Sequence, residues 1–232
     1  MISFIIPAHN EQELLGRTLA AVHDAARAVG RPYEIIVAND SSDDQTGPIA
    51  REHDARVVDV NYRQIAATRN AGARAANGEI LIFVDADTMI TERALRAALR
   101  ALGRGVIGGG CSVRFDGPVP AYAKVMERVT PAILYALRLA PGCFLFCTRQ
   151  AYLDAGGFDE ALYCAEEVFF AQQLKRRGHF VILREFVITS AQKLRSRTAI
   201  ELLMTGLRLA LAGPQSIRKR EGLEYWYGPR GS

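Results

Sequence analysis

Apolar residues in the first hundred positions alternate between short, nearly continuous runs and longer segments with helical spacing. The short runs, such as residues 80–84, are typical of strands buried on both faces. The longer segments carry apolar residues three or four positions apart, as at Leu15, Leu19 and Val22. The pattern predicts strands at 2–7, 33–38, 56–60 and 79–84, alternating with helices at 11–29, 45–53, 65–76 and 91–102.

Strand–helix alternation of this kind predicts an α/β fold with a mostly parallel sheet flanked by helices. The second half is less regular, and no repeat or flexible linker interrupts it. We therefore expect one domain over 1–232, with halves at about 1–104 and 105–232. The second half predicts strands at 106–115, 143–148, 180–183 and 186–189, and helices at 122–139, 165–177 and 197–212. The glycines at 108–110 either let backbone approach a ligand or mark a strand bulge.

Composition narrows the class of protein. The 232 residues are 49% hydrophobic, which is enough for one large core or for one core and a smaller subdomain. The net charge of +4 suits a phosphorylated substrate, but Lys and Arg are dispersed and argue against nucleic acid as a partner. The N-terminus lacks signal-peptide features and no apolar run reaches 18 residues, so we expect a cytoplasmic protein. The four cysteines are expected to be reduced core thiols.

Ligands of open α/β sheets bind beyond the carboxyl ends of the strands. Three segments follow predicted strands directly: 7–11, 39–44 and 85–88. In the last, Asp85 and Asp87 require a compensating cation if both are charged and close. A divalent ion with oxygen ligands would supply it and could neutralise a diphosphate leaving group. Solvated loop acids, one of them capping the next helix, are the alternative.

The other two segments offer ligands for a nucleoside. Asp40 follows the second strand and could accept a hydrogen bond from a base imide, whereas Asp43 or Asp44 is expected to cap the next helix. His9 is interpreted as a turn residue in preference to a ligand. Arg69 either reaches a base or phosphate or is solvated.

An acidic pair begins the predicted helix at 165–177. Glu166 and Glu167 are favoured at a helix N-terminus by the helix dipole, which would be a purely structural role. Alternatively, one of them is a general base that deprotonates an acceptor hydroxyl.

Taken together, these segments resemble the family 2 inverting glycosyltransferases, which have the GT-A fold. The resemblance covers roughly residues 1 to 190, and its landmarks occur in the family's order. They are the opening strand and turn at 4–11, the acidic loop at 35–46, the segments at 67–72 and 77–79, the metal motif at 85–87, and the acceptor-side motif at 156–160 followed by 166–167.

The resemblance implies a nucleotide-sugar donor, with a UDP-sugar favoured, and Mn²⁺ or Mg²⁺ as cofactor. Asp87, with Asp85, would bind the metal. Glu167 would be the general base of a single inverting displacement, with Glu166 positioning the acceptor or supporting the base. The implied donor-binding residues are Pro7, Ala8, Asn10, Glu11, Asp40, Arg69, Asp85 and Ala86.

The sequence departs from the family pattern at several positions. Asn39 stands where Asp is usual, Ser41 where Gly is usual, and Glu167 where Asp is typical. No histidine follows His179, so diphosphate and water are expected to complete the metal shell. The basic segment 190–195 either holds the diphosphate or is a solvated loop.

Rival interpretations come from other classes. Asp85 and Asp87 also match the strand-end signature of aspartate-nucleophile phosphatases, but that signature normally follows the first core strand. A nucleotidyltransferase should carry a Gly-rich loop, which 7–11 lacks. A nucleotide-sugar-binding relative without catalysis is kept open by Asn39 and Glu167.

The sequence leaves the acceptor open between a lipid-linked and a small molecule. The apolar segments 129–148 and 199–212, with basic 218–220, could form a surface for peripheral membrane contact. Core packing with a solvated basic end is the preferred interpretation.

Overall fold

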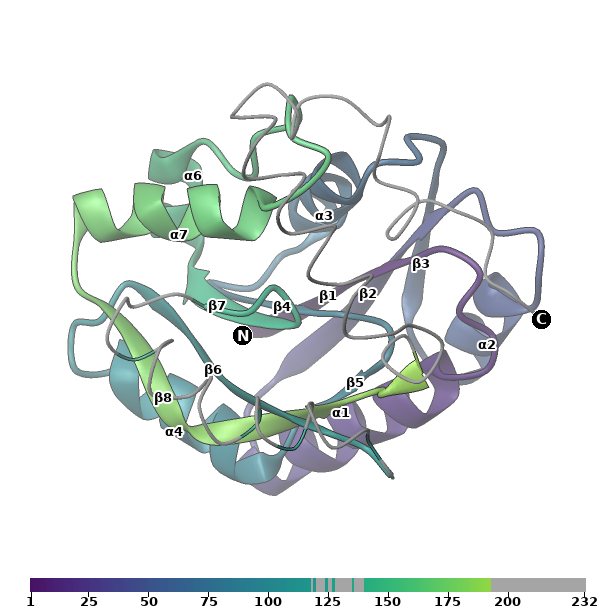
Figure 1. The fold of residues 1–232 in the computed structure, drawn as a ribbon, viewed down its shortest axis with the longest axis horizontal. Helices are drawn as coiled ribbons and strands as arrows, with labels where there is room; N and C mark the ends of the chain where they lie inside the picture. The colour runs from purple at the N-terminus through teal and green to yellow at the C-terminus, as the bar shows by residue number, and fades with distance from the viewer. Residues whose placement is uncertain (118, 120–123, 125–126, 128–134, 136–139, 193–232) are drawn as a thin grey trace.

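The computed structural model describes residues 1–117, 119, 124, 127, 135 and 140–192 (Figure 1). The predicted helix at 197–212 and the basic positions 218–220 lie outside the described residues, as does most of the predicted helix at 122–139. Within the described part, no helix is both long and apolar enough to cross a bilayer.

One eight-stranded sheet runs through both halves of the chain, in the order β3-β2-β1-β4-β7-β6-β8-β5. The first four strands in that order are parallel, and β6 is parallel to β8, whereas β7 and β5 are antiparallel to their neighbours. The predicted mostly parallel sheet is therefore confirmed. The strands are β1 (Ile2–Ala8), β2 (Tyr33–Asp40), β3 (Arg56–Val60), β4 (Ile80–Val84), β5 (Thr88–Met89), β6 (Gly108–Phe115), β7 (Phe144–Thr148) and β8 (Phe180–Thr189).

Helices cover both faces of this sheet. Figure 1 shows α1 and α4 together on one face, and α3, α6 and α7 on the other. Consecutive residues of β1 serve the two cores: Phe4 and Ile6 pack in the first, and Ile5 packs in the second with Phe83 and Phe170. Burial on both faces explains the nearly continuous apolar strands. The helices are α1 (Leu15–Val29), α2 (Thr46–Glu52), α3 (Ile65–Ala75), α4 (Glu92–Leu102), α6 (Arg149–Ala155) and α7 (Glu166–Arg177).

Several elements differ from the sequence prediction, among them the short strand β5, which was not predicted. Helix α1 begins at Leu15 and not at residue 11. The N–H of Glu11 donates to Thr46 Oγ1 (2.7 Å) and ties the preceding turn to the start of α2. The two strands predicted at 180–183 and 186–189 form one strand, β8, with a register irregularity opposite Cys111 and Ser112. Helix α6 was not predicted, although Thr148 caps it by accepting from Ala151 N–H (3.1 Å).

The glycines at the start of β6 are explained by packing and not by a ligand. A Cβ at Gly109 would lie 2.3 Å from Val181 O, and one at Gly110 would lie 2.6 Å from Ala140 Cβ. The irregularity of the strand lies after Cys111, beyond the glycines. Neither a close approach of backbone to a ligand nor a strand bulge is needed to explain these glycines.

Candidate functional site

A cavity of about 720 Å³ lies at the carboxyl ends of β1, β2 and β4, where the first residues of α7 also reach it. The structure brings every predicted site residue into its wall. These residues are Pro7, Ala8, Asn10, Glu11, Asp40, Arg69, Asp85, Ala86, Asp87, Glu166 and Glu167. The strand-end rule therefore located the cavity correctly. The second half of the chain contributes residues 142–143, residues 163–165 and the start of α7 to its wall.

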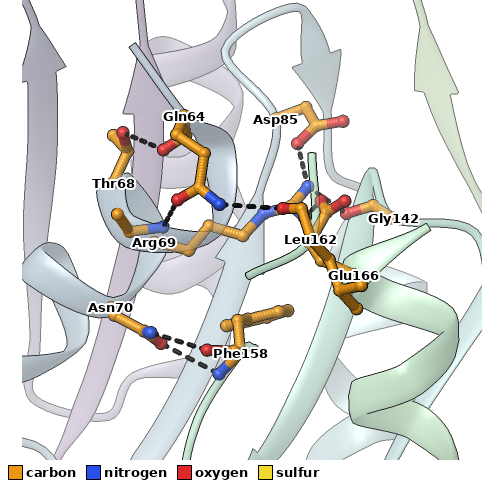
Figure 2. A network of polar contacts seen from close by, with 10 residues as sticks. Gln64, Thr68, Arg69, Asn70, Asp85, Gly142, Phe158, Leu162 and Glu166 are labelled. Carbon is orange, nitrogen blue, oxygen red and sulfur yellow. Dashed lines mark hydrogen bonds and ion pairs between the residues drawn. The ribbon is translucent and has the colours of Figure 1, made fainter. Parts of the chain in front are cut away.

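Arg69, on α3, joins the two halves of the cavity. Its guanidinium donates to Glu166 Oε1 at 2.5 Å and to Asp85 Oδ1 at 2.8 Å, and also to the carbonyl of Gly142 at 3.1 Å (Figure 2). The side chain is only 2% exposed. Burial alone would lower the pKa of Arg69, but Asp85, Glu166 and Glu167 raise it above its ordinary value. Arg69 is thus a buried, charged bridge, which rules out the solvated alternative; a contact with a base or phosphate stays a prediction.

The acceptor-side motif at 156–160 is anchored to the same helix. Asn70 Oδ1 accepts from Phe158 N–H (3.0 Å) and from the Tyr152 hydroxyl (2.8 Å), while its Nδ2 donates to Phe158 O (2.8 Å; Figure 2). Gly157 has a left-handed φ of 72°, and a Cβ there would lie 2.8 Å from Asn70 Oδ1. The Gly and Asn residues of these motifs therefore dock the chain before α7 onto α3.

Glu166 and Glu167 lie side by side at the start of α7 but differ in their surroundings. Glu166 is buried against Arg69, and Glu167 is half-buried in the cavity wall. Burial, and next the neighbouring charge of Glu166, raise the pKa of Glu167 to about 8 against the opposing effect of Arg69. A carboxylate with a pKa near the working pH is a stronger base than an ordinary glutamate, as general-base catalysis requires.

Asp85 and Asp87 follow β4 in a turn that is fixed on two sides. The N–H of Asp85 donates to Cys143 O (3.2 Å), and Asp87 O accepts from Ser190 N–H (3.1 Å). Asp87 Oδ1 lies 3.3 Å from the hydroxyls of both Thr88 and Thr189. Strands β7 and β8 therefore hold this turn from the second half of the sequence.

A divalent cation fits this turn if the substrate supplies most of its ligands. Among the described residues, no group of three or more His, Cys, Asp or Glu side chains gathers to hold a metal. Asp85 already binds Arg69 through Oδ1. A metal ion at this turn would therefore be bound by Asp87 and by at most the other oxygen of Asp85. One or two carboxylates plus phosphate oxygens and water are the shell that Mg²⁺ commonly adopts.

Asp40, predicted to be the ligand of a base imide, accepts hydrogen bonds from within the protein, and its contact with a base stays a prediction. Its Oδ1 accepts from the N–H groups of Tyr62 and Arg63, both at 2.8 Å. Its Oδ2 accepts from Gln64 N–H (3.1 Å) and the Thr68 hydroxyl (2.7 Å). Since a carboxylate offers about four acceptor positions, this buried group is already occupied in organising the start of α3.

The acidic loop after β2 is built from local hydrogen bonds. Asp44 Oδ1 accepts from Thr46 N–H at the start of α2 (2.9 Å), but the N-cap of α2 is Gln45 and not Asp43 or Asp44, one of which was expected there. Asp43 instead pairs with Asn10: its Oδ1 accepts from Asn10 Nδ2 (2.6 Å), and its N–H donates to Asn10 Oδ1 (3.0 Å). Asn10 has a left-handed φ of 52°, so this pair fixes the turn that leaves β1.

Several residues in the cavity wall were missed by the sequence reasoning. Arg63 and Gln64 follow β3, a strand end to which the same rule would have drawn attention. Gln64 Nε2 donates to the carbonyls of Glu160 (2.6 Å) and Leu162 (2.8 Å), so it also ties the two halves together. His9, interpreted as a turn residue, lines the cavity as well.

The cysteines divide into two pairs. All four are free thiols, and Cys111 and Cys147 are buried in the core as expected. Cys143 and Cys164 are only partly buried and line the cavity, which corrects the expectation that all four are core residues. Burial raises the pKa of each of the cavity thiols, so both are protonated at neutral pH.

Comparison with known proteins places this chain in a family. The sequence profile described as glycosyl transferase family 2 matches residues 3–154. A validoxylamine A glucosyltransferase of Streptomyces hygroscopicus subsp. jinggangensis (strain 5008) is 28% identical over 143 residues, which cover 56% of this chain and 33% of that protein. An undecaprenyl-phosphate 4-deoxy-4-formamido-L-arabinose transferase of Edwardsiella ictaluri is 32% identical over 183 residues, covering 73% of this chain and 54% of that protein. The chain thus spans one third to about half of these relatives.

Solved structures with a similar fold include a mannosyltransferase and the protein TarS. The mannosyltransferase PcManGT from Pyrobaculum calidifontis, in complex with GDP-Man and Mn²⁺, has a TM-score of 0.67 and 17% identity, with 97% of this chain and 69% of that chain covered. S. aureus TarS in complex with UDP-GlcNAc has a TM-score of 0.63 and 21% identity, with 82% and 58% covered. The fold of this chain is therefore the GT-A fold.

Proposed function

Because the chain belongs to glycosyl transferase family 2, we propose that it transfers a sugar from a nucleotide-sugar donor to an acceptor hydroxyl with inversion. The observation that carries the proposal is the bridge through Arg69. One guanidinium binds both Asp85, at the strand end where a diphosphate would lie, and Glu166, beside the proposed base. The donor and acceptor groups of the reaction are thereby held in one cavity.

In the proposed reaction, the carboxylate of Glu167 takes the proton of the acceptor hydroxyl. The acceptor oxygen forms a bond to the anomeric carbon as the bond from that carbon to the diphosphate oxygen breaks, on the opposite face. The anomeric configuration is therefore inverted, and Glu167 leaves the step protonated. A pKa near 8 makes Glu167 a strong base for this transfer.

The leaving nucleoside diphosphate carries developing charge that must be neutralised. Asp87, with the second oxygen of Asp85, would hold Mn²⁺ or Mg²⁺ against the diphosphate. Bound there, the ion would supply Lewis-acid stabilisation of the leaving group. Pro7, Ala8, Asn10, Glu11 and Ala86 would form the wall along the nucleoside.

The test is a screen of UDP- and GDP-sugars for hydrolysis and transfer, with and without Mn²⁺. We expect a metal-dependent release of nucleoside diphosphate and its loss in Glu167→Gln. Glu52→Gln, at an exposed acid on α2, is the matched control and should leave the rate unchanged. If the release of nucleoside diphosphate is the same without the metal and in Glu167→Gln, the assignment is contradicted.

A donor-binding protein without catalysis is the second candidate. It is favoured by the same raised pKa, because a carboxyl group with a pKa of about 8 is mostly protonated at neutral pH. Tight binding of a nucleotide sugar without turnover, at pH 7 and at pH 9, would support this alternative.

For the acceptor, we propose a lipid-linked or small hydroxyl compound, met in the cytoplasm or at its membrane surface. The similar transferase of Edwardsiella ictaluri acts, by its name, on undecaprenyl phosphate. Transfer to the hydroxyl of a lipid-linked sugar in anionic liposomes, compared with transfer to a soluble sugar, would separate the two classes of acceptor.

A further inference from the structure

The turn before β7 contacts both sides of the cavity. Gly142 O accepts from Arg69 Nη2 at 3.1 Å (Figure 2). Cys143 O accepts from the N–H of Asp85 at 3.2 Å. A Cβ atom on Gly142 would lie 3.2 Å from Cγ of Glu167 and 3.3 Å from its Cδ. The backbone of the turn is therefore bound to the Asp85 side, whereas the space that a side chain at position 142 would occupy adjoins Glu167.

The backbone conformation at position 142 is one that residues with a side chain can adopt. The φ of Gly142 lies outside the left-handed region, where glycine is favoured. The carbonyl that binds Arg69 would also be present with any other residue. What sets glycine apart here is the missing side chain. Carbon atoms in ordinary contact lie about 3.5–4.0 Å apart, and the Cβ of an alanine would lie closer than that to Glu167.

A side chain at position 142 would act on the carboxyl group of Glu167 more than on Arg69. Glu167 is the second residue of α7, and the ion pair of Glu166 with buried Arg69 holds the start of this helix. An adjustment would therefore fall on the side chain of Glu167, whose Cδ carries both carboxylate oxygens. The added Cβ would lie 3.4 Å from Arg69 Nη2, which is an ordinary van der Waals distance.

We propose that Gly142 is a positioning residue for the proposed general base, because its missing side chain leaves the space beside which the side chain of Glu167 lies; this rests on the proposed function. The same turn is bound to Arg69 and Asp85, so it sets the place of Glu167 relative to the residues expected near the diphosphate. Attack on the anomeric carbon from the face opposite the diphosphate depends on this relative placement. A misplacement of about 1 Å can lower a rate about 10²-fold.

The experiment measures kcat and donor KM for Gly142→Ala in the whole chain, with the UDP- or GDP-sugar that the wild type turns over. A displacement of Glu167 by a few tenths of an ångström should lower kcat about tenfold. The donor KM should stay within about twofold, because the contacts of Arg69 and Asp85 remain. Gly103→Ala is the matched control and should leave kcat unchanged, since Gly103 is exposed at the end of α4 and has a helical φ of −64°.

A double-mutant cycle separates positioning of the base from a general effect on the fold. In the Glu167→Gln background, Gly142→Ala should lower kcat by less than about twofold, because the displaced group no longer accepts a proton. The same loss of kcat in both backgrounds would overturn the inference. An unchanged kcat in Gly142→Ala, or a rise in donor KM alone, would also overturn it.

Urea denaturation provides a second readout that needs no activity. Gly142→Ala should lower the free energy of unfolding of the wild type more than that of Glu167→Ala, in which the contacted carbons are absent. If Gly142→Ala does not fold, the double variant with Glu167→Ala should. Equal losses in the two backgrounds would overturn the inference. If the wild type releases no nucleoside diphosphate from any sugar donor, the proposed function itself fails, whatever the outcome of denaturation.

Discussion

The two sides of the cavity are built by different physical means. On the side of β1, β2 and β3, side chains such as Asp40 and Asp44 are used to satisfy backbone N–H groups of turns and helix starts. On the side of α7, charged groups bind one another through buried Arg69, and Glu167 is left with a raised pKa. The hydrogen bonds on the first side fix the backbone of its loops, whereas the contacts on the second side compensate buried charges.

This difference predicts how substitutions on each side behave. Changes on the first side should act through the geometry of the loops and thus through donor binding and stability. Changes on the second side should act through charge and thus through rate and pH dependence. The bridge at Arg69 belongs to both and should show both effects.

Arg69→Met should have the largest effect. It removes the cation that binds Asp85 and Glu166 and leaves Glu166 as an uncompensated buried charge. Breaking a buried pair in this way typically costs about 3–5 kcal/mol. Urea denaturation would measure the loss, with Arg74→Met, at an exposed arginine of the same helix, as control. A loss no greater than that of the control would show that the bridge does not hold the two sides together.

Glu167→Gln should lower kcat by a factor of about 10²–10⁴, the usual contribution of a general base. The donor KM should change little, because the proposed base acts on the acceptor. Steady-state kinetics with donor and acceptor varied in turn would check this. If only the donor KM rises in this variant, Glu167 contributes to donor binding and is not the base.

Asp40→Asn should cost about 1–3 kcal/mol in stability, because the amide places an N–H group among donors that now meet a carboxylate. Donor affinity should fall with it, since the loop carrying Arg63 loses its support. Thermal unfolding and nucleotide binding would measure the two effects. Asp59→Asn, at an exposed acid on β3, is the control. Weaker donor binding with full stability would mean that Asp40 contacts the donor directly, as the sequence had suggested.

The pH dependence of the transfer rate and of stability should both come from Glu167. The raised pKa means that transfer by ionised Glu167 increases with pH and is half-maximal at about 8. The folded state also holds this proton more tightly than the unfolded state, so Glu167 lowers stability as pH rises from about 4.5 to about 8. A pH–rate profile and a series of urea midpoints would record both trends. Both should disappear in Glu167→Gln, and a trend that survives would belong to another group.

The sequence alone predicted most of the elements in the first hundred residues. Apolar runs and helical spacing are local properties, and β1 to β4 with their helices follow them closely. The turn before α1 was harder to predict, because its Glu11 N–H donates to Thr46 Oγ1, far away in sequence. The cap of α6 is local, since Thr148 accepts from Ala151 N–H, and a Thr at that position could have indicated the helix. In the second half, β7 lies between β4 and β6, a position that no local pattern encodes.

By itself, the sequence determined the α/β class, the family resemblance and the residues that meet in the cavity, because parallel strands bring their carboxyl ends to one edge. Only the tertiary structure decided what those residues do there. It occupies Asp40 with backbone donors, buries Arg69 between two acids, raises the pKa of Glu167, and turns Arg63 toward His9. Each of these depends on distance, burial and competing partners, which are set when segments distant in the sequence pack together.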